Sequence, residues 1–344
     1  MRRETLEGTS RKTKVLSKLQ KPLIFFILIL LFLFAVKDSL PDVMDTLTKT
    51  SLSVVIAAML SCCIYHVIEG RIIHILAKHH RSDYPLTHGI GCAFYGSFYR
   101  VVTFGSGSGV ASIHYLNQTG VPVANGTGMT ITQYILHKIS ISLFSAVFFL
   151  INRDFLYQHH SGYFKQLLLC YGATILVSVF LLTICMFHKC HFYILLLCKK
   201  LDRKNKYEKQ IEALEQNLNT LRTETTLLIT NKKLIVKIII MDCLKLFFFY
   251  AIPCILNGDL KSLNLIDSLT LTSFTAAVAG IIPTPAGIGS TEFVFTLLFT
   301  PVLGRVDAIS IGLLYRFITY IFPCIPGIFA VLFYKRSVPH GSKK

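Results

Sequence analysis

The feature that most constrains this chain is a series of long apolar segments. These segments are Leu23–Val36, Ser51–Ile68, Leu167–Phe187, Leu234–Leu256 and Ile309–Phe333. Most approach the roughly 20 residues that a helix needs to cross the hydrocarbon core of a bilayer. Because lipid offers the backbone no hydrogen-bond partner, such segments must be helical. Only 15% of the 344 residues are charged, against about 25% in soluble domains. We therefore expect an all-α polytopic membrane protein.

The basic residues, which give a formal net charge of +17, gather beside these apolar segments. Residues 1–21 hold seven basic and two acidic side chains, residues 188–233 hold ten and five, and residues 335–344 hold four and none. Basic juxtamembrane clusters favour the cytoplasmic side, so we expect both termini in the cytoplasm. The sequence has no basic groove interleaved with aromatic residues, which argues against nucleic-acid binding.

The clusters also divide the chain into five regions. These are a cytoplasmic N-terminus (1–22), a first transmembrane half (23–187), a cytoplasmic amphipathic segment (188–233), a second transmembrane half (234–334) and a cytoplasmic tail (335–344). The ten cysteines follow no disulfide or metal-ligand spacing, and no nucleotide-binding or nucleophile motif is present. We expect no metal, no cofactor and no catalytic residue.

The first half contains a stretch that must begin and end in the cytoplasm although it is largely apolar. This stretch, residues 88–130, has Arg100 as its only Lys, Arg, Asp or Glu. A re-entrant hairpin satisfies both facts. Its turn is Phe104-Gly-Ser-Gly-Ser-Gly109, where Gly105, Gly107 and Gly109 each cost a helix about 1 kcal/mol relative to alanine.

The second half repeats this pattern from the opposite side. Residues 262–304 must begin and end outside, and Pro283-Thr-Pro-Ala-Gly-Ile-Gly289 interrupts them because Pro283 and Pro285 cannot continue a helix. Each half is thus predicted as helix, broken re-entrant hairpin, helix, in inverted orientation, as in secondary transporters. Gly109 precedes His137-Lys138 by 28 residues and Gly289 precedes Tyr315-Arg316 by 26. Two ordinary hairpins with glycine kinks are the alternative.

Several charges fall inside apolar segments. The basic ones are Arg100, Lys138, Lys237, Lys245 and Arg316, and the acidic ones are Asp242 and Glu292. A charge at the bilayer centre costs at least about 2.5–3.5 kcal/mol, so each needs a partner or a watery cavity. Lys237 can extend to the cytoplasmic interface, and Asp242 and Lys245 can neutralise each other on one helix face.

The remaining charges suggest a site for an anionic headgroup. Glu292 follows Gly289-Ser290-Thr291, where the returning helix of the second hairpin should begin. A helix N-terminus favours phosphate, and we expect Ser290 to cap it and Glu292 to complement its dipole. The candidate lipid-binding residues are Arg100, Lys138, Gly287, Gly289, Ser290, Glu292, Tyr315 and Arg316. A plain salt bridge between Glu292 and Arg316 is the alternative.

Residues 207–228 have a different pattern. Tyr207, Ile211, Leu214, Leu218, Leu221 and Leu228 are spaced by fours and threes, with Thr225 filling one position. This heptad seam predicts a cytoplasmic helix that packs on a second copy of the chain as a homodimer. A helix that lies against the membrane surface is the alternative.

These motifs resemble those of a known family. The break at 283–289 with Glu292, then Leu314-Tyr315-Arg316 and Tyr320…Pro323…Gly327, resembles the C-terminal signature of the lysylphosphatidylglycerol synthase/flippase membrane-domain family. Phe104-Gly-Ser-Gly107 followed by Leu136-His137-Lys138 is similar to its weaker N-terminal motif, and the resemblance covers nearly the whole chain. Ala286 and Lys138 depart from the glycine and arginine usual in the family.

The resemblance implies a lipid-translocating domain of the bacterial inner membrane, often dimeric, that acts on glycerophospholipids such as aminoacylated phosphatidylglycerol. In full-length relatives a soluble C-terminal domain transfers lysine from lysyl-tRNA to phosphatidylglycerol. This chain stops ten residues after its second transmembrane half, so we expect no enzymatic activity of its own, with a separately encoded aminoacyltransferase as a possible partner. We expect a flippase or transporter-like protein that binds membrane phospholipids. A lysyltransferase or its membrane component, and a non-transporting scaffold, are the alternatives.

Overall fold

The computed structural model describes residues 48, 50–186, 231–258, 263–282, 284 and 287–337, together with scattered positions between 196 and 223. Several predictions lie outside these residues: the N-terminal residues 1–22, the apolar segment Leu23–Val36, most of the heptad seam, Pro283, Pro285 and Ala286, and residues 338–344. Within the described residues the chain forms helices and no strand, which confirms the predicted fold class.

The described helices follow the same order twice. In the first half α3 (Leu52–Ala77) leads to the short helices α4 (Leu86–Val102) and α5 (Ser108–Gln118), then to α6 (Val123–Ile151), α7 (Arg153–His160), the 3-10 turn η1 (Ser161–Tyr163) and α8 (Phe164–Met186). In the second half α11 (Lys232–Tyr250) and α12 (Ile252–Leu256) lead to α13 (Leu265–Ala279) and α14 (Ser290–Leu303), then to α15 (Arg305–Arg316), η3 (Phe317–Ile321) and α16 (Cys324–Ser337). Each half therefore contains a long helix, a pair of short helices and a second long helix.

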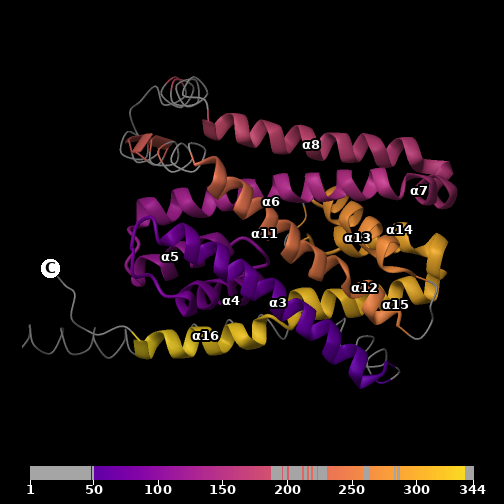
Figure 1. Cartoon of the computed structure of the whole chain (residues 1–344), viewed down its shortest axis with the longest axis horizontal. Coiled ribbons are helices and arrows are strands. Elements are labelled where there is room, and N and C mark those ends of the chain that lie inside the picture. Colours follow the sequence, from indigo (N-terminus) through magenta and orange to yellow (C-terminus); the bar gives the residue numbers. More distant parts are fainter. Residues whose placement is uncertain are drawn as a thin grey trace, which may run out of the picture.

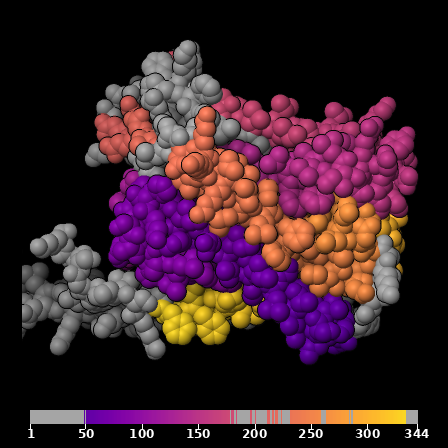
Figure 2. Space-filling model, in the orientation of Figure 1, coloured from indigo at the N-terminus to yellow at the C-terminus, as the bar shows by residue number. Residues whose placement is uncertain are grey.

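Four described helical stretches are long and apolar enough to cross a membrane. They are Leu52–Ala77, Val123–Ile151, Lys232–Leu256 and Arg305–Phe333, while Leu265–Ala279 and Ser290–Leu303 are apolar but shorter. The two pairs of short helices lie toward opposite ends of the long axis of the molecule (Figure 1). In the space-filling view the side chains of α4 and α5 likewise lie toward one end and those of α7, α13 and α14 toward the other, while α3 extends along the molecule between them (Figure 2). That these pairs are re-entrant hairpins which enter from opposite sides stays a prediction.

Helix boundaries differ from the apolar segments in three places. The segment predicted to end at Ile68 continues as helix to Ala77. The hairpin predicted to extend to residue 130 ends earlier, because the next long helix begins at Val123, after Pro122 at its N-cap. The predicted tail from residue 335 is helical as far as Ser337. Helices that continue past an apolar segment carry polar residues into the bundle.

The hairpin helix α4 packs closely between α3 and α16. A Cβ atom on Gly70 would lie 2.4 Å from the Ile90 Cα, and one on Gly89 would lie 2.2 Å from the Gly70 carbonyl oxygen. On the other side, a Cβ on Gly327 would lie 2.7 Å from the Phe94 carbonyl oxygen. Small residues at such crossings allow backbones to approach closely, which stabilises helix pairs in membranes.

Helix α14 keeps its backbone polar groups satisfied although Pro301 lies inside it. Proline has no N–H group, so it cannot donate to the carbonyl four residues earlier. The Tyr163 hydroxyl donates to that carbonyl, Leu297 O, at 3.0 Å, and His160 Nε2 lies 2.9 Å from Leu298 O. The end of the second hairpin is thereby attached to the α7–α8 corner.

We predict that Gly70→Ala lowers the thermal unfolding midpoint, because its new methyl group must push α4 away from α3. Gly172→Ala is the matched control, since it lies inside α8 and its Cβ would meet nothing within 4 Å. The purified variants can be compared by fluorescence-monitored thermal unfolding in detergent. Equal midpoints for the two variants would contradict the close crossing.

Candidate functional site

A chain of side-chain contacts connects the breaks of the two hairpins. It passes through Arg316 and Tyr320, in the helical stretch that follows the second hairpin. The Arg316 Nε donates to Glu292 Oε1 at 2.9 Å, and its guanidinium lies over the Tyr320 ring at 4.3 Å. The Tyr320 hydroxyl donates to the Arg100 carbonyl oxygen at 3.1 Å. Glu292 belongs to α14 and Arg100 to α4, so this chain of contacts joins the second hairpin to the first.

Tyr320 reaches Arg100 from an irregular part of its helix. Residues Phe317–Ile321 form a π-helical turn, in which the Phe322 N–H donates to the Phe317 carbonyl five residues earlier at 2.8 Å. Such turns inside α-helices often occur at functional sites, because the extra residue redirects the side chains around it. Here the turn follows directly after Arg316.

The N-terminus of α14 is held by Glu292 rather than by Ser290. Gly289 is the N-cap residue, with a φ of +82° that favours glycine, and its N–H donates to Glu292 Oε2 at 2.7 Å. The predicted cap at Ser290 is wrong: its hydroxyl donates back to the Gly287 carbonyl at 3.2 Å and lies 2.7 Å from the Thr284 hydroxyl. The predicted cap is displaced by one residue, since Ser290 is already the first helical residue.

Two further predicted residues lie away from this contact chain. Tyr315 is buried in the apolar core, with its ring stacked on Phe295 at 5.5 Å between centroids. Lys138 on α6 lies at the end of α13, where a Cβ on Gly280 would be 3.3 Å from its Nζ. A cation at a helix C-terminus is stabilised by the exposed carbonyl groups, so Lys138 has a structural reason for its position.

The first hairpin is broken where the sequence predicted. Phe104 and Gly105 have positive φ angles of 51° and 87°, and Gly107 is the N-cap residue of α5. Gly109 is the exception, because it lies inside α5 and lines a cavity instead of breaking the helix.

This cavity lies among α3, α4, α5 and α6 and has a volume of about 200 Å³. That is more than ten times the roughly 15 Å³ that one water molecule requires. Its lining surface is about equally polar and apolar. The polar residues that contribute to it are Tyr65, His66, Glu69, Ser97, Arg100, Ser108, Ser112, Thr130, Gln133, Tyr134 and His137, and the others are Ile73, Cys92, Ala93, Gly96, Gly109 and Leu116. A polar cavity of this size inside an apolar helix bundle can hold a hydrated or ionic group.

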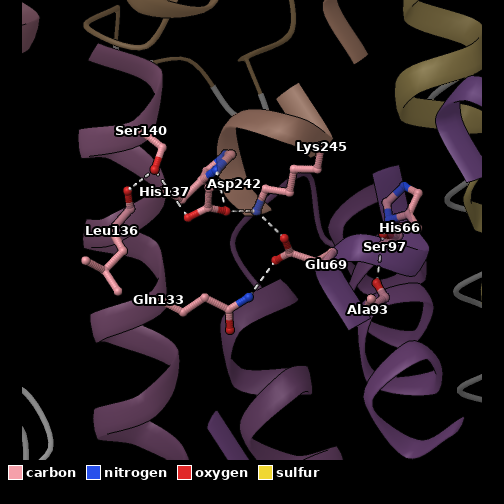
Figure 3. A network of polar contacts seen from close by, with 10 residues as sticks. All are labelled: His66, Glu69, Ala93, Ser97, Gln133, Leu136, His137, Ser140, Asp242 and Lys245. Atoms are coloured by element: carbon pink, nitrogen blue, oxygen red, sulfur yellow. Dashed lines mark hydrogen bonds and ion pairs between the residues drawn. The ribbon is translucent and has the colours of Figure 1, made fainter. Parts of the chain in front are cut away.

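A buried cluster of charges (Figure 3) adjoins the cavity through Glu69, which lines it. Lys245 on α11 forms ion pairs with Asp242, at 2.5 Å on the same helix, and with Glu69 on α3. The side chains of Asp242 and Lys245 are completely buried, whereas that of Glu69 is 22% exposed. Of these two ion pairs, that of Asp242 with Lys245 was predicted from the sequence, but that of Glu69 with Lys245 was not.

Neighbouring polar groups complete this cluster. The Gln133 amide donates to Glu69 Oε1 at 2.7 Å, and the Ser140 hydroxyl donates to Asp242 Oδ2 at 3.4 Å. His137 Nδ1 lies 3.8 Å from Asp242 Oδ1, and the Lys245 ammonium lies 5.5 Å from the centroid of the Tyr65 ring. The cluster therefore connects α3, α6 and α11 at the depth of the cavity.

Sequence reasoning missed Glu69 because the apolar segment before it stops at Ile68. The signal was present, since Ile72, Ile73, Ile75 and Leu76 continue the apolar pattern beyond Glu69-Gly-Arg71. Reading these residues as one helix would have placed Glu69 inside the membrane. A buried carboxylate there would have needed a cation, and Lys245 is one of the few that the apolar segments offer.

We predict that Lys245→Met greatly reduces the yield of folded protein, because it leaves Asp242 and Glu69 without their shared cation. Removing one partner of a buried ion pair costs about 3–5 kcal/mol. Lys237→Met, an exposed position on the same helix, should retain the yield of the unmodified protein in size-exclusion chromatography. Adding Asp242→Asn to Lys245→Met should recover part of the loss, and identical yields for all variants would contradict a stabilising role.

Comparison with known proteins agrees with the motifs and the fold. No curated protein matches the chain. The sequence profile of the lysylphosphatidylglycerol synthase TM region matches residues 21–327, which is most of the chain. The chain therefore belongs to the lysylphosphatidylglycerol synthase TM-region family, and it is a multi-pass membrane protein of a family named for lysylphosphatidylglycerol synthesis.

Proposed function

We propose that this protein is a flippase that moves the headgroup of an anionic or aminoacylated glycerophospholipid across the bacterial inner membrane. The observation that supports this most is the polar cavity beside the first hairpin, which holds the charged side chains of Glu69 and Arg100. A lipid headgroup cannot cross the hydrocarbon core cheaply, because its charges lose their hydration there. Polar side chains that line a cavity can replace this hydration, and they thereby lower the free-energy barrier to movement of the headgroup across the membrane.

Arg100 is the residue in the best position to bind a phosphate. It lies near the end of α4, is exposed, and lines the cavity. Among the described residues no carboxylate forms an ion pair with its guanidinium. Guanidinium groups bind phosphate oxygens through two parallel hydrogen bonds. Arg316, by contrast, is already engaged by Glu292 and Tyr320.

The surface around the bundle supports an arrangement in which the acyl chains stay in the bilayer. Large apolar side chains are exposed on several long helices, including Leu60 on α3, Leu150 on α6, Leu176 on α8 and Ile240 on α11. Such an apolar belt suits contact with lipid tails. We infer that the headgroup alone enters the polar cavity while the tails remain outside.

A flip assay in proteoliposomes tests this proposal. With fluorescent phosphatidylglycerol and a membrane-impermeant quencher, the unmodified protein should accelerate loss of the protected inner-leaflet signal. Arg100→Gln should slow this rate by about tenfold or more, since a hydrogen bond to a charged group contributes about 1.5–3 kcal/mol. Arg153→Gln, an exposed position on α7, should retain the rate. Equal rates for the two variants would contradict a role for Arg100.

Variants of Arg316 distinguish a role in holding the start of α14 from a role in binding the lipid headgroup. Arg316→Ala should reduce folded yield, because Glu292 loses the cation that helps it hold the start of α14. The double variant Arg316→Ala with Glu292→Gln should recover both yield and flip rate. A double variant that folds fully but does not flip lipid would instead assign headgroup binding to Arg316.

The family description favours one other function, because it names a synthase. Incubation of the purified protein with lysyl-tRNA and phosphatidylglycerol distinguishes the two. Formation of lysyl-lipid above a protein-free control would assign a transferase activity to this chain. Lipid movement without lysyl-lipid formation would assign the flippase.

A further inference from the structure

The formal charges of the residues that line the cavity and of those in the buried cluster sum to zero. Glu69 and Asp242 are negative, and Lys245 and Arg100 are positive. Asp242 and Lys245 are completely buried and do not line the cavity, whereas Glu69 pairs with Lys245 and also lines the cavity. Glu69 and Arg100 are therefore the two charges that the cavity itself presents.

An anion that binds Arg100 disturbs this balance. The headgroup brings a negative charge into a space that Glu69 already shares, and like charges in a poorly hydrated cavity repel strongly. Neutrality returns if the Glu69 carboxylate accepts one proton. The proton comes from hydronium or a buffer acid in the solvent that reaches the cavity. One O–H bond forms on the Glu69 carboxylate, the bond to the proton in that acid breaks, and the conjugate base remains in the solvent.

We propose that Glu69 is a proton site, and that it takes up one proton whenever an anionic lipid headgroup binds at Arg100. This inference rests on the proposed function, because it assigns the energy coupling of the same site. Headgroup passage would then carry a proton in the same direction, so that a pH difference across the membrane can drive lipid movement.

The geometry selects Glu69 over Asp242 as the proton acceptor. Glu69 lines the cavity and is partly exposed, whereas Asp242 does not line it and is completely buried against Lys245. When Glu69 is protonated, Lys245 keeps Asp242 as its counter-ion, so no buried cation is left unpaired. Gln133 can remain hydrogen-bonded to Glu69 in either state, since an amide both donates and accepts.

Other titratable groups face the same space. From α3 these are Tyr65 and His66, from α4 Cys92 and Arg100, and from α6 Tyr134 and His137. From α11, Lys245 pairs with Glu69 and with Asp242 without lining the cavity. His66 Nε2 is buried without a hydrogen-bond partner among the described residues. The two histidines are the competing proton sites, and the experiment must separate them from Glu69.

The coupling has a definite sign. Because binding consumes a proton, affinity for an anionic lipid rises as the pH falls. If one proton is taken up for each lipid bound, affinity should change by about tenfold for each pH unit. Replacing Glu69 by glutamine should remove this pH dependence, so that the affinity for anionic lipid stays at its low-pH value at every pH.

Isothermal titration of the full-length protein in detergent with short-chain phosphatidylglycerol measures this coupling directly. Repeating the titration in buffers of different ionisation enthalpy gives the number of protons taken up per lipid bound. We expect about one proton for the unmodified protein and for the matched control Glu212→Gln, an exposed glutamate outside the transmembrane helices. We expect none for Glu69→Gln.

Each outcome bears on a different statement. Binding by the unmodified protein without proton uptake would overturn the coupling and leave the proposed function in place. Uptake that persists in Glu69→Gln but disappears in His137→Gln or His66→Gln would overturn the assignment to Glu69. If Glu69→Gln does not fold, the proton count of the unmodified protein alone decides whether coupling exists. Absence of both binding and lipid movement would overturn the proposed function, and the coupling with it.

Discussion

The buried ammonium of Lys245, shared between Asp242 and Glu69, is the interaction on which the rest of the structure depends. A lone cation at this depth would cost several kcal/mol, so α11 can cross the bundle here only if carboxylates meet it. Asp242 comes from the same helix, but Glu69 must come from α3. The requirement for neutrality thereby fixes the relative depth of the two long helices that begin each described half.

The same constraint explains why the cavity lies beside the first hairpin. Glu69 needs polar surroundings, and α6 supplies Gln133 on one side while the broken helices α4 and α5 leave space on the other. Helix α4 cannot close this space by moving toward α3, because Gly70 and Gly89 already bring the two backbones together. The second hairpin differs in this respect. The start of its second helix, α14, is held by Glu292, which pairs with Arg316. Tyr320, against the Arg316 guanidinium, connects this contact to Arg100 at the first hairpin.

Much of this fold could be predicted from the sequence. Apolar segment length and the position of basic residues indicate helices and their order, and glycine runs indicate where the first hairpin breaks. Glu69 was missed because a single polar step, Glu69-Gly-Arg71, looks like the end of a helix when charges are assumed to lie outside the membrane. Its role depends on Lys245, which is 176 residues away, and no local pattern encodes that contact. Tyr315 and Arg316 are neighbours in the sequence, yet one packs in the core and the other meets Glu292, because adjacent helical residues point in different directions.

The central claim is that the cavity beside the first hairpin binds an anionic phospholipid headgroup through Arg100. Native mass spectrometry of the purified protein, with identification of the lipids that remain bound, tests this most directly. We expect the unmodified protein to retain anionic phospholipid and Arg100→Gln to lose it while both proteins remain folded. Equal retention of anionic lipid by the two proteins would contradict the account.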